Sequence, residues 1–159
     1  MAQCILKIAL DTPLNALFDY RWNGDEAALP QVGQLALVPF GRREVMGLIV
    51  GVSDSTDVPA AKLKDVLAVR SQLAPLSEQW LALAAFAADY YQRPLGEVAL
   101  PGLPKNLRVL TTVALDRAIK KLAKLADAHD GTPLNMPALN AAQQEAADAI
   151  GGAQGFQPT

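Results

Sequence analysis

Cysteine, histidine and long apolar runs are scarce in this sequence of 159 residues, and each shortage excludes a class of protein. The single cysteine, Cys4, cannot form a disulfide within the chain, and the single histidine, His129, has no cysteine partners at zinc-ligand spacing. The longest strongly apolar run, Leu81–Ala88, is far shorter than the roughly 20 residues of a membrane-spanning helix. Charges at Lys7 and Asp11 interrupt the N-terminal apolar run, which therefore differs from a secretory signal. We expect a cytoplasmic protein that holds no metal and enters no membrane.

Neither sign of charge dominates the sequence. Its 14 Lys and Arg residues stand against 16 Asp and Glu residues, so the formal net charge is -2 and the whole chain has no electrostatic attraction to nucleic acid or anionic lipid. The charges are uneven, however, with a net charge of -1 over residues 1–75, +3 over 76–125 and -4 over 126–159. Any contact with a polyanion must therefore be local. Hydrophobic residues make up 51% of the chain, which excludes disorder throughout.

Motifs that carry catalysis or cradle phosphate are absent from the sequence. It contains neither Gly-x-Gly-x-x-Gly nor Gly-x-x-x-x-Gly-Lys-Ser/Thr, the glycine-rich patterns that place main-chain N–H groups around phosphates. The carboxylates are scattered, and no general acid and base pair stands out. We therefore expect no catalytic residue, no bound ATP and no other cofactor in this chain.

The N-terminal part of the chain has the pattern of β-structure. Apolar residues run together or alternate over Ile5–Leu10, Phe18–Trp22, Leu35–Phe40 and Val45–Val52. The last two runs have hairpin spacing, and Leu63–Val69 is an ambiguous strand. Gly47 and Gly51 lie inside a predicted strand, where glycine is costly unless the sheet bends as it does in small barrels.

The pattern changes to that of helices after Ser77, which is a suitable N-cap residue. A helix is predicted over Trp80–Tyr91, and Leu95–Leu103 leaves room for one short helix or turn. Two further helices are predicted over Asp116–Ala128 and Ala141–Ile150. The predicted fold class is α+β: a small, mostly β, barrel-like N-terminal domain with a helical cap, followed by a short helical remnant.

A basic stripe lies on the predicted helix over Asp116–Ala128. Its cations recur at offsets of three, four and seven and share one face: Arg117, Lys120, Lys121 and Lys124. This face could contact phosphates, although such a run is more often a solvated helix surface.

An aromatic stripe is formed by Phe18, Tyr20 and Trp22, which alternate with charged residues along one strand. Alternation places the three rings on one face of the strand. The stripe could stack on nucleic-acid bases, but composition alone favours a role in the core.

Five short segments then occur in a particular order. They are Phe18-Asp19-Tyr20, Gly33–Gly41, Gly47–Val50, Leu63–Val66 and Ala88–Glu97. Collinear over residues 1 to about 108, they resemble the N-terminal DNA-binding domain of the PriA (primosomal protein N') family, the bacterial replication-restart helicases. A sixth segment, Leu139–Gln143, resembles the opening helix of the family's helicase core.

This resemblance implies a domain organisation. Residues 1–108 would form a 3'-end DNA-binding domain, β-rich over 1–72 and helical over 76–104. Residues 109–138 would be a shortened linker or winged-helix remnant, and 139–159 the start of a helicase core that ends before the phosphate loop. ATP with Mg²⁺ and structural zinc would then belong to parts of the parent helicase that this chain lacks.

The resemblance also implies a site that holds the 3'-terminal nucleotide of a nascent leading strand. The matching positions are Phe18, Asp19, Tyr20, Gly41 and Lys64. Asp19 would accept a hydrogen bond from the terminal hydroxyl or a base edge, and an aromatic ring would cover a base. Gly41 would let a main chain approach where a Cβ would collide, and Lys64 would neutralise a phosphate.

A regular strand would direct Asp19 away from the rings of Phe18 and Tyr20, so a bend or main-chain contacts must let one pocket use all three. We expect Tyr20 and Trp22 to belong to the core. The implied function is to target an attached helicase to stalled replication forks for primosome assembly and replication restart. Its partners would be DNA with a free 3' end and, through the parent, primosome and single-strand-binding proteins. The alternatives are a protein-interaction module and a general single-strand binder without end selectivity.

Overall fold

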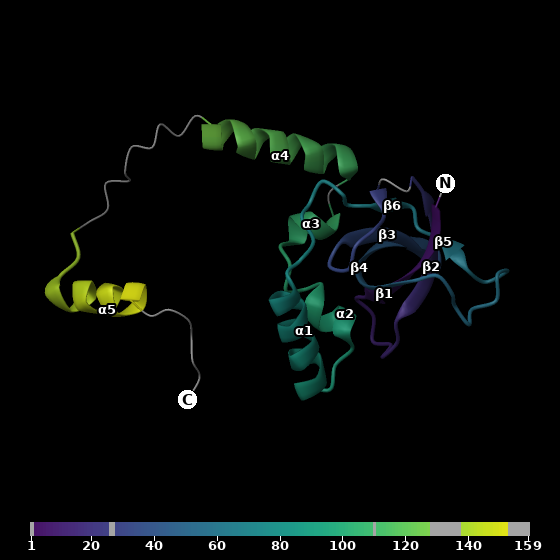
Figure 1. Cartoon of the computed structure of the whole chain (residues 1–159), viewed down its shortest axis with the longest axis horizontal. Helices are drawn as coiled ribbons and strands as arrows, with labels where there is room; N and C mark the ends of the chain where they lie inside the picture. Colours follow the sequence, from purple (N-terminus) through teal and green to yellow (C-terminus); the bar gives the residue numbers. More distant parts are fainter. Residues whose placement is uncertain (1, 26–27, 110, 128–137, 153–159) are drawn as a thin grey trace. The chain divides into compact units, whose positions relative to one another are not determined.

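A computed structural model describes residues 2–25, 28–109, 111–127 and 138–152 (Figure 1). The chain divides into two compact units, Met1–Lys120 and Lys121–Thr159. The first unit contains all strands of the described residues, and the helix α4 (Thr112–Asp127) crosses from the first unit into the second. His129 lies outside the described residues, and the predicted domain boundaries remain predictions.

The core of the first unit is a curled six-stranded sheet in the order β5-β2-β1-β4-β3-β6 (Figure 1). Its four long strands are β1 (Ala2–Leu10), β2 (Phe18–Gly24), β3 (Leu35–Phe40) and β4 (Arg43–Ser53). They confirm the strands predicted from the four apolar runs, and β3 and β4 pair as the predicted hairpin.

The segment predicted as one ambiguous strand, Leu63–Val69, instead forms two short strands, β5 (Lys64–Asp65) and β6 (Ala68–Val69). β5 pairs in parallel with β2, whereas β6 pairs antiparallel with β3 at the opposite edge of the sheet. Only Val66 and Leu67 separate the two. One segment therefore joins both edges, and this requires the sheet to curl into a half-barrel.

The curl begins where β1 and β4 pair. Their register shifts between Lys7, which faces Gly51, and Ile8, which faces Ile49. Such a bulge bends a sheet and increases its twist. At Gly47 a Cβ would lie 2.3 Å from the Ile8 Cγ2 atom, so only glycine lets the two strands pack this closely. Both observations agree with the bend expected from the glycines of β4.

Two hydrophobic clusters hold the sheet. The cluster inside the curl contains Cys4, Leu6, Ile8, Leu10, Tyr20, Ala36, Val38 and Ile49. The second contains sheet residues such as Leu35 and Leu48 together with helical residues such as Ala84 and Leu100. β1 is buried on both faces, since Ile5 and Ala9 on its other face are also less than 9% exposed. The predicted α+β fold with a barrel-like β domain is confirmed.

The helical cap contains α1 (Glu78–Tyr90), α2 (Leu95–Ala99) and α3 (Lys105–Val109). Ser77 caps α1 as predicted, because its hydroxyl oxygen accepts a hydrogen bond from the Trp80 N–H over 3.3 Å. A Cβ at Gly96 would lie 1.9 Å from the Leu10 carbonyl oxygen, so glycine allows α2 to approach β1. The sequence analysis left the segment that forms α3 unassigned.

The two C-terminal helices lie close to their predicted positions. α4 begins four residues earlier than expected, because Thr111 rather than a residue near Asp116 starts the helix and accepts a hydrogen bond from the Ala114 N–H. α5 covers Ala141–Gly152. Among the described residues, every helix is too short or too polar to span a lipid bilayer.

Candidate nucleic-acid interface

A cavity of about 320 Å³ lies between β2, the β3–β4 turn and the segment that leads into β5. Its lining consists of Leu17, Phe18, Asp19, Tyr20, Pro39, Phe40, Gly41, Val58, Lys62 and Lys64. All five residues that the family resemblance singled out are among them. These residues come from three segments that are far apart in the sequence, and the closure of the half-barrel brings them together.

The cavity lies beside a part of β2 that lacks a partner strand on one side within the described residues. β5 pairs with β2 only at Tyr20 and Arg21, so the residues before Tyr20 have no partner strand on that side within the described part of the chain. An unpaired strand edge presents main chain as well as side chains of both faces. Phe18 and Asp19 can therefore line the same cavity although they alternate along the strand, which answers the geometric difficulty raised by the sequence.

Aromatic residues form the inner wall of the cavity. Tyr20 is 4% exposed and belongs to the core, as predicted, while its hydroxyl donates a hydrogen bond to the Pro39 carbonyl oxygen over 3.2 Å. Burial raises the pKa of the Tyr20 hydroxyl above its ordinary value. Phe18 is half-buried and meets Phe40 edge-to-face, with ring centroids 5.2 Å apart. Phe18 is thus the more accessible of the two rings expected to cover a base.

Asp19 is a half-buried carboxylate at the wall of this cavity. Its Oδ2 atom accepts a hydrogen bond of 2.5 Å from the hydroxyl of Thr56, which lies in the loop between β4 and β5. The main chain of β2 holds Asp19 opposite Lys7 of β1. The carboxylate is therefore neither sealed in the apolar core nor free to rotate.

Gly41 occupies the β3–β4 turn with a φ angle of +61°, a conformation that L-residues rarely adopt. A Cβ at this position would have no atom of the chain within 4 Å. Glycine is therefore required here by the turn and not by a collision within the chain. The resulting open space adjoins the cavity, which is compatible with the expected close approach of a ligand.

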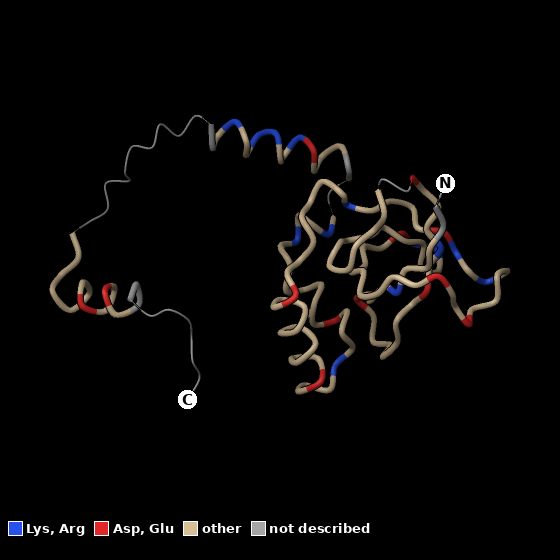
Figure 2. The backbone as a smooth tube through the Cα atoms, in the orientation of Figure 1, with Lys and Arg blue, Asp and Glu red and all other residues tan. Residues whose placement is uncertain are grey.

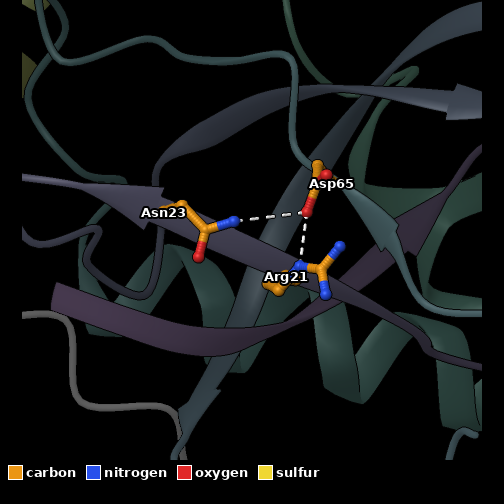
Figure 3. A network of polar contacts seen from close by, with 3 residues as sticks. All are labelled: Arg21, Asn23 and Asp65. Atoms are coloured by element: carbon orange, nitrogen blue, oxygen red, sulfur yellow. Dashed lines mark hydrogen bonds and ion pairs between the residues drawn. The ribbon is translucent and has the colours of Figure 1, made fainter. Parts of the chain in front are cut away.

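Lys64 is exposed at the start of β5 and is paired with Tyr20. The position of this two-residue strand is secured by its neighbour, because Asp65 Oδ1 accepts a hydrogen bond of 2.6 Å from Arg21 Nε and a longer one of 3.4 Å from Asn23 Nδ2 (Figure 3). The hydrogen bond from Arg21 lowers the pKa of the Asp65 carboxyl and raises that of Arg21. The Arg21–Asp65 pair holds the strand that carries Lys64 against β2.

Lys62 also lines the cavity, a position that the sequence analysis did not single out. Its spacing of two residues from Lys64 was a usable signal, since side chains two apart in an extended segment share a side. The β3–β4 turn adds two exposed cations next to Gly41, Arg42 and Arg43. Two lysines therefore line the cavity, and two arginines follow Gly41 directly in the sequence. This concentration of positive charge suits a polyanionic ligand.

Basic residues recur along α4 (Figure 2), and the four cations of the basic stripe are all exposed: Arg117, Lys120, Lys121 and Lys124. None of them lines the cavity. Their phosphate contacts remain a prediction. No group of three or more His, Cys, Asp or Glu residues within the described ranges is arranged to hold a metal ion.

A half-barrel with an aromatic wall, one oriented carboxylate and lysines at its cavity has the features of a small domain that binds an anionic, ring-containing ligand. Comparison with known families identifies the kind of ligand that the family binds. Residues 7–104 match the family described as the 3'DNA-binding domain (3'BD) of PriA, and the chain belongs to this DNA-binding family.

Curated relatives agree with this assignment. The chain is 37% identical over 107 residues to the replication restart protein PriA of Haemophilus influenzae, an alignment that covers 65% of this chain and 14% of that protein. It is 27% identical over 149 residues to PriA of Treponema pallidum, covering 91% of this chain and 21% of the relative. PriA of Buchnera aphidicola is 26% identical over 103 residues, covering 65% and 14%. The chain thus spans at most about a fifth of the length of these relatives.

Proposed function

We propose that this domain recognises the 3'-terminal nucleotide of the nascent leading strand at a stalled replication fork. One observation carries the proposal: Phe18, Asp19, Tyr20, Gly41 and Lys64, which the sequence resemblance assigned to end recognition, line a single cavity. Its volume of about 320 Å³ is at the lower end of the range of small-molecule pockets, roughly 300–1,000 Å³. This size suits one nucleotide unit better than a run of several.

The chemistry of the cavity distinguishes a strand end from a strand interior. An end carries a free 3'-hydroxyl, and Asp19 offers this hydroxyl a charged acceptor, which makes one of the stronger hydrogen bonds in proteins. Phe18 covers the base face, an interaction that tolerates any base. Lys64, together with Lys62, neutralises the phosphate that precedes the terminal sugar. A strand interior has a phosphate in place of the free hydroxyl, and Asp19 repels it.

Within a full-length PriA-like protein, end recognition would target the attached helicase to abandoned forks for primosome assembly and replication restart. This role belongs to the cytoplasm. The chain itself would catalyse no reaction and bind no cofactor, and ATP, Mg²⁺ and zinc would serve other parts of such a protein. The exposed cations of α4 would contact phosphates outside the cavity.

The test compares oligonucleotides that end in a 3'-hydroxyl with the same sequences that end in a 3'-phosphate, and adds a circular single strand as competitor. We expect preference for the free hydroxyl and weak competition by the circle. Asp19→Ala should remove the preference, whereas Asp57→Ala, at an exposed loop carboxylate that does not line the cavity, should retain it. Equal affinity of the unaltered chain for both ends would refute end recognition, and strong competition by the circle would indicate a general single-strand binder.

A protein-binding role has its own supporting observation at the C-terminal end of α1. The rings of Phe86, Tyr90 and Tyr91 are 66%, 69% and 68% exposed, and contact one another in sequence with centroids 5.9 and 5.0 Å apart. Exposed aromatic clusters mark interaction surfaces. Primosome or single-strand-binding proteins could reach a full-length protein through such a surface. Phe86→Ala with Tyr90→Ala should then weaken capture of such a protein and leave binding of DNA ends unchanged; unchanged capture would exclude this surface.

A further inference from the structure

The loop between β4 and β5 is tied to the cavity by the hydroxyl group of Thr56. This hydroxyl donates to Asp19 Oδ2, while the Thr56 oxygen accepts a hydrogen bond of 3.1 Å from the Val58 N–H. Because the Val58 amide supplies a hydrogen to the Thr56 oxygen, the single hydroxyl proton is directed to the carboxylate. Thr56 is half-buried, and its contact with Asp19 joins residues 37 positions apart.

The contact leaves the two oxygens of Asp19 in different situations. Oδ2 is engaged by Thr56, whereas Oδ1 has no hydrogen-bond partner within the described residues. A carboxylate held through one oxygen cannot rotate freely about its terminal torsion, so the second oxygen keeps a constant direction. A preorganised acceptor binds a donor without first losing rotamer freedom.

The same contact positions a wall of the cavity. Val58 and Lys62 line the cavity from this loop, and the bond to Asp19 is made two residues before Val58. Other hydrogen bonds of the loop are local, such as the one of 2.8 Å from the Lys62 N–H to the Pro59 carbonyl. Thr56 therefore connects the loop that carries Val58 and Lys62 to the strand that carries Asp19.

We propose that Thr56 is a positioning residue that sets selectivity for a free 3'-hydroxyl. Through its hydroxyl it orients Asp19 so that Oδ1 accepts a hydrogen bond from the terminal sugar, and it holds Val58 and Lys62 at the cavity. This inference rests on the proposed function of the cavity and adds the residue on which its selectivity depends. Thr56 itself does not line the cavity, so it acts through Asp19.

The experiment measures affinity of the full chain for an oligonucleotide with a 3'-hydroxyl end and for the same oligonucleotide with a dideoxy end, which lacks only that hydroxyl. Thr56→Val keeps the shape of the side chain and removes its hydroxyl. We expect this variant to lose roughly threefold to tenfold of the preference for the hydroxyl end, the range for one hydrogen bond. Thr56→Ser should keep the preference. Ser53→Ala is the matched control, because the Ser53 hydroxyl, at the end of β4, donates locally to the Ser55 carbonyl and not to Asp19.

A double-mutant cycle with Asp19→Asn shows whether Thr56 acts through the carboxylate. When Asp19→Asn is already present, Thr56→Val should cause no further loss of preference. A full preference in Thr56→Val, or an equal loss for both ends that serine does not restore, would overturn the role of Thr56 alone. If the unaltered chain binds both ends equally, the proposed function of the cavity fails as well, so the two failures are distinguishable.

Discussion

Arg21 and Asp65 join two strands that are 44 residues apart in sequence through a hydrogen-bonded ion pair of 2.6 Å between Nε and Oδ1. β5 contains only two residues, so a short ladder and this pair hold it against β2. The main-chain hydrogen bond from the Val66 N–H to the Arg21 carbonyl, 2.9 Å long, continues the ladder. Closure of the half-barrel beside the cavity therefore depends on a contact at the surface.

Acid should loosen this closure. The hydrogen bond from Arg21 lowers the pKa of Asp65 below its ordinary value of 3.8, so the contribution of the pair is complete above that pH and is lost as the pH falls through the lower folded-state pKa. The protection factor of the Val66 amide, which is its intrinsic exchange rate divided by the observed rate, should fall over this acid range. Asp65→Asn should already show faster exchange at neutral pH and no such acid step. The same exchange in both proteins would contradict a role for the pair.

The salt dependence of DNA binding should show whether the lysines of the cavity contact phosphates. Each phosphate that a cation neutralises contributes about 0.7 to the slope of log affinity against log salt for a single strand. Lys64→Gln should therefore reduce the magnitude of the slope by about this amount, and Lys62→Gln should do the same. Lys105→Gln, an exposed position that does not line the cavity, serves as the control. A slope that is unchanged in Lys64→Gln would argue against a phosphate contact there.

Gly41 should be sensitive to any side chain although space is available. At a φ angle of +61°, Gly41→Ala should destabilise the fold by about 1–2 kcal/mol, the usual cost of the left-handed region. Gly51→Ala is the comparison, because a Cβ there would meet Lys7 at an ordinary distance of 3.4 Å. Urea unfolding measures both. Equal stabilities of the two variants would mean that the turn tolerates a side chain.

Phe18 should contribute more to the affinity for DNA than Trp22, which lies on the same strand. Phe18→Leu removes the accessible ring of the cavity and should weaken binding of a 3'-ended oligonucleotide by about 1–3 kcal/mol, the value for one stacked base. Trp22→Leu truncates a ring that packs against the core and does not line the cavity, so it should lower stability and spare affinity. Fluorescence anisotropy with a labelled oligonucleotide would measure both affinities. Equal losses would exclude stacking on Phe18.

Local patterns in the sequence were sufficient to predict most elements. The apolar run over Leu35–Phe40 is β3 without any change of its bounds, and Ser77 caps α1 as its residue type predicts. These features depend on neighbours within a few residues, where alternation and capping act. The start of α4 was misplaced by four residues because its cap, Thr111, was not considered.

The candidate site was predictable in its residues but not in its construction. The family resemblance named Asp19 and Lys64, yet the sequence could not show that Leu63–Val69 would divide into two strands at opposite edges. Nor could it indicate Thr56, whose partner on β2 is 37 positions away. Contacts of this kind depend on the curl of the sheet and not on local preference.

Short, collinear patterns in the sequence are enough to locate most of the strands and helices and to name the residues that resemble a DNA-end site. They do not show that these residues line one cavity, because that depends on contacts between distant segments. β5 and β6 bind opposite edges of the sheet across a two-residue link, and this closure brings β2, the β3–β4 turn and the β4–β5 loop together.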